Sequence, residues 1–191
     1  FGKEETSSFL NFLQENSLVP ETILLTHAHL DHILGVQKLC EIFGCRVYMN
    51  PADAPVLTFD EFMAKKLGMG EFKAAFTYLP AEDGDTIDTA GISLKVIGTP
   101  GHTPGCVCYY AEKEGMLFSG DTLFRGTIGR TDLEYGNYDD EIRSVMDKLM
   151  GLPSEVEVYP GHGAPTTIGA ERYGNPFLEP WGDAEEDTQS L

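Results

Sequence analysis

The chain has 191 residues, of which 41% are hydrophobic and 23% are charged, a composition typical of a globular domain that buries a full hydrophobic core. Lys and Arg number 13 against 31 Asp and Glu, which gives a formal net charge of −18. This field repels nucleic acid, and no basic cluster offsets it. No apolar run is long enough to span a bilayer. We therefore expect neither a nucleic-acid partner nor a membrane.

Hydrophobic periodicity predicts alternating helices and strands in the first half of the chain. The predicted elements are a helix over 7–15, a short buried strand over 22–26, a helix over 33–44 capped by Gly44, a strand over 45–50, and one or two surface helices within 51–79. The last of these segments is a candidate wall for a substrate site.

The second half combines hairpins with a strand–helix unit. The predicted elements are β-structure over 83–103 with turns at Asp83-Gly84 and Ala90-Gly91, a hairpin over 106–121 that turns at 113–115, a helix over 139–150, and a strand over 156–163. We expect a single domain over 1–180, built as α/β layers around two sheets, and an acidic, disordered tail over 181–191.

The four cysteines are spaced without a C-x-x-C pair or a zinc-ribbon pattern. Cysteines of this kind are typical of buried free thiols in a reducing compartment, so the sequence predicts a cytoplasmic location.

Four potential metal ligands are packed into the segment TILLTHAHLDHILG, residues 22–35. His27, His29 and Asp31 alternate directly after a predicted strand, so their side chains project to the same side of the chain. His32 follows at the start of the next helix. Imidazole and carboxylate groups this close together suit a borderline divalent ion.

The other two histidines of the chain have similar surroundings. His102 lies in TPGHTPG and His162 in YPGHGAP, each on a turn that follows a predicted strand, and Asp121 in LFSGDTL also follows a strand. Loops at strand ends gather along one edge of a sheet. The sequence therefore predicts that all five histidines and two aspartates form one metal site.

The order of these residues along the chain resembles the metallo-β-lactamase superfamily. The resemblance implies an αβ/βα sandwich of two mixed β-sheets flanked by helices. It also implies two divalent metal ions, zinc first, with iron or manganese as alternatives. By position in the family's motif, the ligands are His27, His29 and His102 on the first ion, Asp31, His32 and His162 on the second, and Asp121 as the bridge between them.

The same resemblance implies how the site acts. Two such ions share a hydroxide whose pKa falls towards neutrality, and they stabilise the oxyanion that forms when it attacks a carbonyl. Asp31 orients the hydroxide, so that Asp31 and Asp121 are the expected catalytic residues. Class B lactamases have a different ligand in place of Asp121, and many have arginine in place of His32, so antibiotic hydrolysis is disfavoured.

Two segments resemble the glyoxalase II group, the hydroxyacylglutathione hydrolases. They are SGDTLFRGTIGRTD over 119–132 and GHGAPTTIGAERYGNPFL over 161–178, the second being similar to short bacterial relatives of that group. Arg130 occupies the position of a basic residue that contacts glutathione, and Arg125 lies on the same loop. The resemblance implies an anionic thioester substrate held by guanidinium–carboxylate contacts.

Three departures from the family pattern bear on this interpretation. Glyoxalase II enzymes continue into a helical domain, whereas here the chain ends 29 residues after His162, and Gly163-Ala164 replaces the family's Glu-Tyr. The family also begins with a β-hairpin and an Asp-Pro-Gly turn, whereas this sequence opens at FGKEET, where that turn ends. We expect a first sheet that lacks its first strands and exposes an edge, with lowered stability or association through that edge.

Three functions follow as hypotheses. The first is a dinuclear metal hydrolase that cleaves a hydroxyacyl thioester, with lactone hydrolysis as a variant. The second is a persulfide dioxygenase with a single iron on His27, His102 and Asp121, and less well on His29. The third is a protein that binds metal without turnover. A monomer or a weak homo-oligomer is expected in each case.

Overall fold

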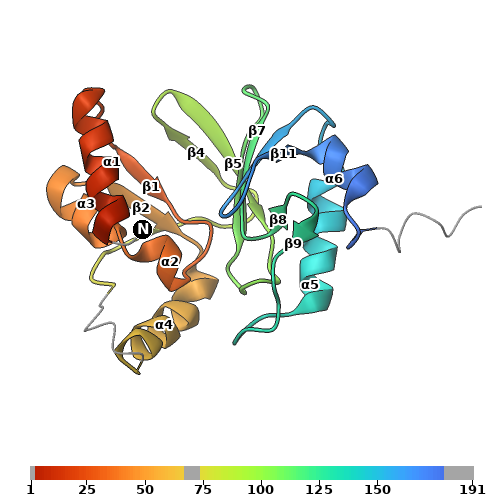
Figure 1. Cartoon of the computed structure of the whole chain (residues 1–191), viewed down its shortest axis with the longest axis horizontal. Coiled ribbons are helices and arrows are strands. Elements are labelled where there is room, and N and C mark those ends of the chain that lie inside the picture. The colour runs from red at the N-terminus through yellow and green to blue at the C-terminus, as the bar shows by residue number, and fades with distance from the viewer. Residues whose placement is uncertain (1–2, 67–73, 179–191) are drawn as a thin grey trace, which may run out of the picture.

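Two β-sheets pack face to face in the computed structural model, which describes residues 3–66 and 74–178 (Figure 1). The smaller sheet has the order β1-β2-β3 and its described strands are parallel: β1 (Thr22–Leu24), β2 (Arg46–Met49) and β3 (Leu79–Pro80). The larger sheet is mixed, in the order β11-β10-β7-β6-β5-β4. Its strands are β4 (Thr86–Thr89), β5 (Ile92–Gly98), β6 (Val107–Ala111), β7 (Met116–Gly120), β10 (Glu157–Pro160) and β11 (Thr166–Thr167).

Helices cover the outer face of each sheet, which makes a four-layer αβ/βα sandwich (Figure 1). The smaller sheet carries α1 (Lys3–Glu15), α2 (Leu30–Ile33), α3 (Val36–Phe43), η1 (Pro51–Asp53) and α4 (Ala54–Lys66). The larger sheet carries α5 (Tyr138–Arg143), η2 (Ser144–Leu149) and α6 (Ile168–Gly174). A short hairpin of β8 (Leu123–Phe124) and β9 (Thr127–Ile128) follows β7.

The core is divided among the three interfaces of this sandwich. Ile33, Val36 and Val47 belong to a cluster that joins the smaller sheet to its helices. Leu117, Leu149, Val158 and Ile168 belong to the corresponding cluster of the larger sheet. A third cluster lies between the sheets and is formed by Ala81, Ile87, Leu94, Val96, Val107, Tyr109 and Ala111. Strands that face apolar layers on both sides explain runs such as VCYYA, in which every residue of β6 is buried.

The predicted fold class is confirmed, and most predicted elements are found near their expected ends. Gly44 ends α3 with a left-handed backbone at φ 67°, as the sequence predicts. The helix expected over 33–44 begins three residues later, because the chain turns between α2 and α3 at Gly35. The sequence analysis missed β11, α6 and the β8–β9 hairpin. The predicted tail over 181–191 lies outside the described residues.

The two sheets are joined by hydrogen bonds at the end of β1. The Val107 amide donates to the Thr26 carbonyl at 2.8 Å, and the buried Tyr109 hydroxyl donates to the Leu25 carbonyl at 2.8 Å. The chain then enters the segment with His27 and His29. These contacts fix the start of that segment against the larger sheet.

An apolar groove of about 850 Å³ lies between the sheets, on the side where β1 is the edge strand of its described sheet. Ile23, Leu34, Leu94 and Phe118 are among its lining residues, and Asp31 and His162 lie at one end of it. β1 is therefore one edge of this described sheet. The expectation that strands are missing before it, and that copies associate there, stays a prediction.

The structure also bears on the expectations about a membrane and about the cysteines. Among the described helices, none combines the length and apolar character that a membrane crossing requires. All four cysteines are free thiols, and Cys45, Cys106 and Cys108 are buried. Burial raises the pKa of the Cys108 thiol to about 12, so this group stays protonated and packs as a small apolar side chain.

The hydroxyl of Tyr109 provides a test of the sheet junction. Tyr109→Phe removes the donor from a buried carbonyl, and we expect a loss of about 1–2 kcal/mol in the free energy of unfolding. Urea unfolding of the chelator-treated protein measures it. Tyr159→Phe is the matched control, because the Tyr159 hydroxyl bonds an exposed Glu157 carboxylate. Equal losses in the two variants would contradict the proposed role of Tyr109.

Candidate metal centre

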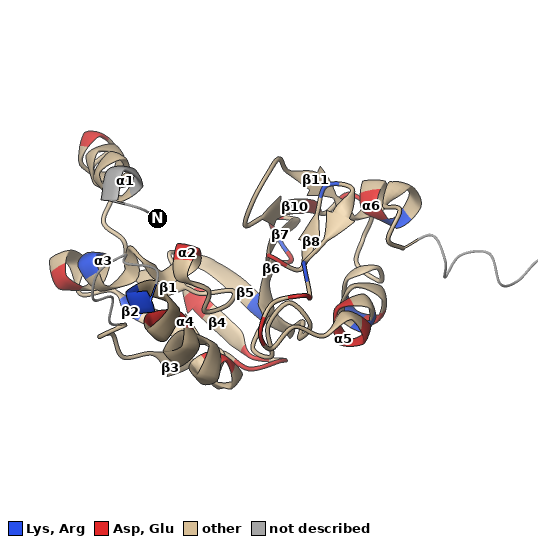
Figure 2. Cartoon of the chain, turned by 60° about the horizontal axis from the view of Figure 1, so that its bottom comes forward, with Lys and Arg blue, Asp and Glu red and all other residues tan. Residues whose placement is uncertain are grey.

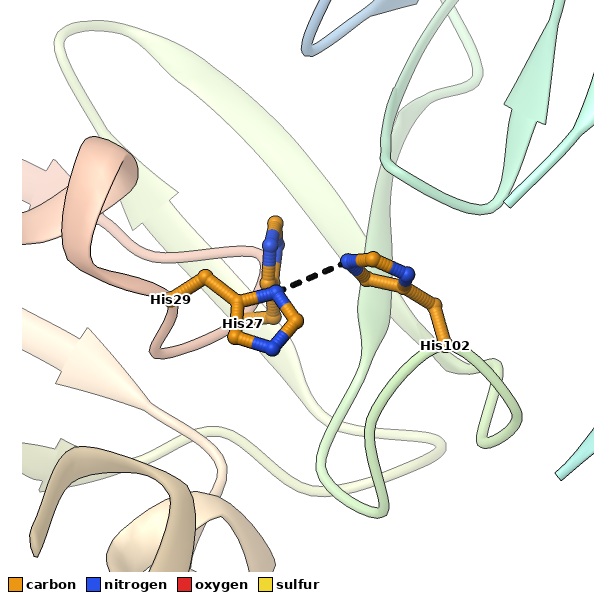
Figure 3. A group of neighbouring side chains, drawn as sticks. All are labelled: His27, His29 and His102. Carbon is orange, nitrogen blue, oxygen red and sulfur yellow. Dashed lines mark hydrogen bonds between the residues drawn. The ribbon is translucent and has the colours of Figure 1, made fainter. Parts of the chain in front are cut away.

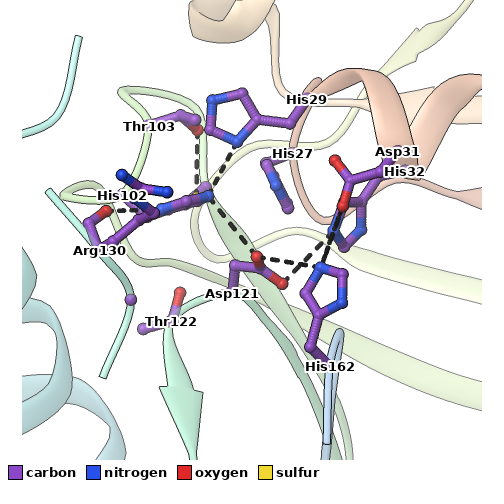
Figure 4. A network of polar contacts seen from close by, with 12 residues as sticks. His27, His29, Asp31, His32, His102, Thr103, Asp121, Thr122, Arg130 and His162 are labelled. Carbon is purple, nitrogen blue, oxygen red and sulfur yellow. Dashed lines mark hydrogen bonds and ion pairs between the residues drawn. The ribbon is translucent and has the colours of Figure 1, made fainter. Parts of the chain in front are cut away.

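The seven predicted ligands meet in one place, although they come from four segments of the chain (Figure 4). His27 and His29 follow β1, Asp31 and His32 lie on α2, His102 follows β5, Asp121 follows β7, and His162 follows β10. β5 and β7 are both antiparallel to β6, and β10 is parallel to β7, so these three strands end at the same edge of the larger sheet. The hydrogen bonds of Leu25 and Thr26 with β6 bring the end of β1 to the same place. The sequence analysis predicts that these side chains gather at one sheet edge, and the structure has them there.

The ligand atoms form three overlapping groups within 4.8 Å. One group is His27, His29 and His102 (Figure 3), another is Asp31, His32 and His162, and a third is His27, His32 and Asp121. Asp121 stands between the first two groups: its Oδ2 lies 3.7 Å from His102 Nε2 and 3.5 Å from His162 Nε2, and its Oδ1 lies 3.4 Å from His32 Nε2.

In the first group and in the Asp31, His32 and His162 group, a ring nitrogen of one histidine lies close to a ring nitrogen of another. His29 Nδ1 is 2.9 Å from His102 Nε2, and His32 Nε2 is 3.3 Å from His162 Nε2. Two imidazole ligands of one tetrahedral zinc ion have nitrogens roughly 3.3 Å apart, given Zn–N bonds of about 2.05 Å. The spacing of these pairs is therefore close to that of ligands that share an ion.

Two buried polar atoms of the described residues have no hydrogen-bond partner, His27 Nε2 and Asp121 Oδ1. An unsatisfied buried acceptor is costly, and native structures contain few of them. Both atoms belong to the ligand groups and point into the cluster (Figure 4). A cation would satisfy both, so the residues present fit a bound metal.

The second nitrogen of two ligand rings is held by the protein. His102 Nδ1–H donates to the Arg130 carbonyl at 2.7 Å, which leaves the lone pair of Nε2 directed at the cluster. His27 Nδ1 contacts the Thr26 hydroxyl at 3.2 Å, so that its Nε2 is the inward atom. Such contacts fix the tautomer and the ring orientation of metal-binding histidines.

Burial keeps two of the rings neutral. Burial, together with the charge of neighbouring rings, lowers the pKa of His27 well below its usual value and lowers the pKa of His29 to about 4. Burial acts to raise the pKa of Asp121, but the close contact with His32 and the charges of the neighbouring rings outweigh it and lower this pKa. Neutral imidazoles beside an ionised carboxylate are the protonation states that bind metal.

Close packing leaves no room for side chains at two glycines of the site. A Cβ at Gly120, whose φ is +53°, would overlap Thr26. A Cβ at Gly161 would overlap the Asp121 carboxylate and lie 2.8 Å from the His32 ring. These glycines let β7 and β10 end directly against the ligands.

Buried acids, which sequence analysis missed, support the ligand segments from behind. Glu141 of α5 accepts from the His102 amide at 2.8 Å and from the Gly129 amide at 3.2 Å, and burial raises its pKa to about 8. Asp53 and Asp60 accept backbone amides of the 27–32 segment. Acidic residues on helices are common surface features, so no local pattern marks Asp53 and Glu141 as buried or Asp60 as half-buried.

A cleft of about 750 Å³ opens beside the ligands. Phe59 and Met63 of α4 and the loop residue Leu133 contribute apolar surface, so the segment expected to form a substrate wall does line the cleft. Arg130 also lines it, whereas Arg125 does not and is exposed on the β8–β9 turn. Arg130 forms a two-pronged ion pair with Asp132, at 2.8 Å on both contacts.

The lowered pKa of His29 gives a pH test on chelator-treated protein. Between the usual value of 6.5 and about 4 the unfolded chain binds a proton that the folded chain does not, so stability falls as pH drops through this range. We expect His29→Gln to flatten this fall. Thermal unfolding between pH 7 and 4 measures it, and the opposite contribution of Glu141 cancels in the comparison. Parallel curves for parent and variant would contradict the assignment.

Comparison with known proteins agrees with this geometry. The sequence profile of the metallo-β-lactamase superfamily matches residues 4–162. An uncharacterised protein of Mycobacterium tuberculosis is 43% identical over 190 residues, covering 93% of this chain and 84% of its own length. The hydroxyacylglutathione hydrolase GloC of Haemophilus influenzae is 33% identical over 179 residues, covering 91% and 83%.

Solved structures are similar over the same extent. The crystal structure of TTHA1623 in a di-iron-bound form matches with a TM-score of 0.81 and 38% identity, over 90% of this chain and 84% of the other. The B3 metallo-β-lactamase BLEG-1 matches with a TM-score of 0.82 and 37% identity, over 91% and 84%. With its ligand groups on this fold, the chain belongs to the metallo-β-lactamase superfamily.

Proposed function

We propose that this protein is a dinuclear metal-dependent hydrolase that cleaves a hydroxyacyl thioester of the glutathione type. The observation that carries the proposal is the pair of three-residue ligand groups with Asp121 between them. The name of the Haemophilus relative, a hydroxyacylglutathione hydrolase, supports the choice of a thioester.

The ligand residues divide the work at the centre. His27, His29 and His102 would hold one ion, and Asp31, His32 and His162 the other, with Asp121 shared. Two divalent ions there supply Lewis acidity, which lowers the pKa of water and stabilises negative charge on a carbonyl oxygen. The side chain of Asp31 is 59% exposed and lies 3.0 Å from His162 Nε2, so it reaches the centre from the solvent side. From there its carboxylate accepts a proton of the attacking water and orients it.

The cleft provides the binding surface for the substrate. Its apolar side, with Phe59 and Met63, packs the acyl or carrier chain, and Arg130 binds a carboxylate of an anionic carrier. The exposed ion pair of Arg130 with Asp132 is weak in solvent, so a substrate carboxylate can take the place of Asp132. Arg125 lies outside the cleft lining and is proposed as a contact for a carrier that extends beyond it.

A persulfide dioxygenase is the second candidate, because His27, His102 and Asp121 together supply two imidazoles and one carboxylate, the ligand set of mononuclear non-haem iron. The second group of Asp31, His32 and His162 favours the dinuclear centre instead. Elemental analysis separates the two: two metals per chain are expected for the hydrolase. One iron per chain, with oxygen consumption on a persulfide, would favour the dioxygenase.

The nature of the metals and partners is part of the proposal. Zinc is proposed as the native metal, although the same ligands accept iron or manganese. A monomer or weak homo-oligomer, a cytoplasmic location and the lack of nucleic-acid or membrane partners stay predictions.

Hydrolysis of S-lactoylglutathione by zinc-loaded protein tests the function, with Asp121→Asn as the matched variant. We expect saturable turnover in the parent and a loss of at least about 100-fold in kcat in the variant, because the carboxylate that joins both ligand groups becomes a neutral amide. Atomic absorption should show less bound metal in the variant.

Other outcomes have definite meanings. The β-lactam nitrocefin serves as the competing substrate and should be cleaved far more slowly than the thioester. Turnover by Asp121→Asn at the parent rate would refute the dinuclear mechanism. Metal-loaded protein that cleaves no thioester would refute the proposed function and leave metal binding without turnover.

A further inference from the structure

The HAHLDH segment lies between the ligand cluster and two carboxylates, the buried Asp53 and the half-buried Asp60. His27, His29 and Asp31 point into the cluster, and the residues between them turn their backbone amides the other way. The Ala28 amide donates to Asp53 Oδ2 at 2.8 Å, and the Leu30 amide donates to Asp60 Oδ2 at 2.6 Å. The segment thus has metal ligands on one side and two carboxylates on the other.

Both acids come from the same rigid element. Asp53 ends η1 and Asp60 lies in the middle of α4, which continues directly from η1. Seven residues make nearly two helical turns, so the two side chains are on the same face of this continuous helix. The helix therefore serves as a support along which the ligand segment lies.

Asp53 also holds the other ligand loop of the first group. Its Oδ1 accepts from the Gly105 amide at 2.6 Å, and its Oδ2 accepts from the Thr103 hydroxyl at 3.0 Å. Asp53 is 0% exposed, and its three donors come from the two loops that carry His27, His29 and His102. One carboxylate therefore sets the separation of these loops.

We propose that Asp53 and Asp60 are positioning residues for the metal centre: Asp53 fixes the spacing of the His27–His29 and His102 loops, and Asp60 fixes the segment that leads into Asp31. The proposal deepens the proposed function and rests on it. Backbone amides held from behind leave the ligand side chains less freedom to lose on binding an ion. Two negative charges behind the ligands also favour a cation in front of them.

Substitution by asparagine separates this role from ordinary packing. At Asp53, which accepts on both oxygens, an amide has only one acceptor oxygen, so its NH₂ group faces a backbone N–H; the volume is kept while part of the anchoring is lost. Asp60 accepts a single backbone amide, which an asparagine oxygen would still accept, so Asp60→Leu, which has no acceptor, is used there. Glu171 provides the matched control, since it is a buried acid with three donors, Gly126, Thr166 and Asn175, none of which is a ligand.

The experiment measures metal affinity in the parent, Asp53→Asn, Asp60→Leu and Glu171→Gln. Each protein is stripped with a chelator, checked by thermal unfolding, and titrated with Zn²⁺ against a chromophoric competitor. The visible spectrum of the Co²⁺-loaded protein reports the ligand geometry. We expect Asp53→Asn to lower metal affinity by about 10–100-fold and to change the Co²⁺ spectrum, and Asp60→Leu to lower affinity by about 10-fold.

The control gives the opposite pattern if the proposal holds. Glu171→Gln should lower the unfolding temperature of the metal-free protein and leave metal affinity and the Co²⁺ spectrum unchanged. Parent-like metal affinity and spectrum in a folded Asp53→Asn would overturn the role of Asp53. If Asp53→Asn does not fold, Asp60→Leu decides: parent-like affinity there would overturn the proposal. Absent thioester cleavage by the parent would refute only the proposed function, because none of these readouts needs a substrate.

Discussion

The convergence of lone pairs at one edge of the sandwich is the constraint on which the rest of the structure depends. Imidazole nitrogens 2.9 Å and 3.3 Å apart, together with a buried imidazole nitrogen and a buried carboxylate oxygen that have no hydrogen-bond partner, form an arrangement that a bound cation satisfies. The fold maintains this arrangement through rigid neighbours: hydrogen bonds between the sheets at Leu25 and Thr26, and buried acids behind the ligand loops. The hydrogen bonds that stabilise the fold thus also hold the ligand nitrogens and oxygens close together.

Acidic side chains have different roles at the surface and behind the ligands. Acidic side chains are spread over both halves of the sandwich (Figure 2), and the net charge of −18 favours cations near the surface as a whole. Behind the ligands, however, Asp53 and Glu141 are buried and accept backbone amides, so they act on a few atoms through hydrogen bonds. The excess of acid thus combines a diffuse field with fixed local anchors.

The sequence predicts most helices and strands and the clustering of the seven candidate ligands, because these depend on strong local patterns, whereas the sandwich itself follows from the family resemblance. An apolar run that ends in alternating histidines is legible without any structure, and so is the left-handed glycine at the end of α3. The short elements β8, β9 and β11 have two residues each and carry no periodicity, so they escape prediction. Asp53, Asp60 and Glu141 escape for another reason: their partners lie 25, 30 and 39 residues away. These acids meet their partners only in the folded chain, so the local sequence does not reveal the contacts. The position of Arg125 outside the cleft is likewise a property of the β8–β9 turn, since adjacency to Asp121 in sequence does not imply adjacency in space.

Each ligand group takes members from both sheets, and this has a consequence for how the chain assembles. His29 and His102 are 73 residues apart, and His32 and His162 are 130 apart. An unfolded chain therefore has no preformed site, and an ion that binds only the folded state shifts the folding equilibrium by mass action. Each ion would act as a cross-link between the two sheets, closing a long loop without a covalent bond. The thermal stability of this protein would then follow the supply of free metal in its surroundings.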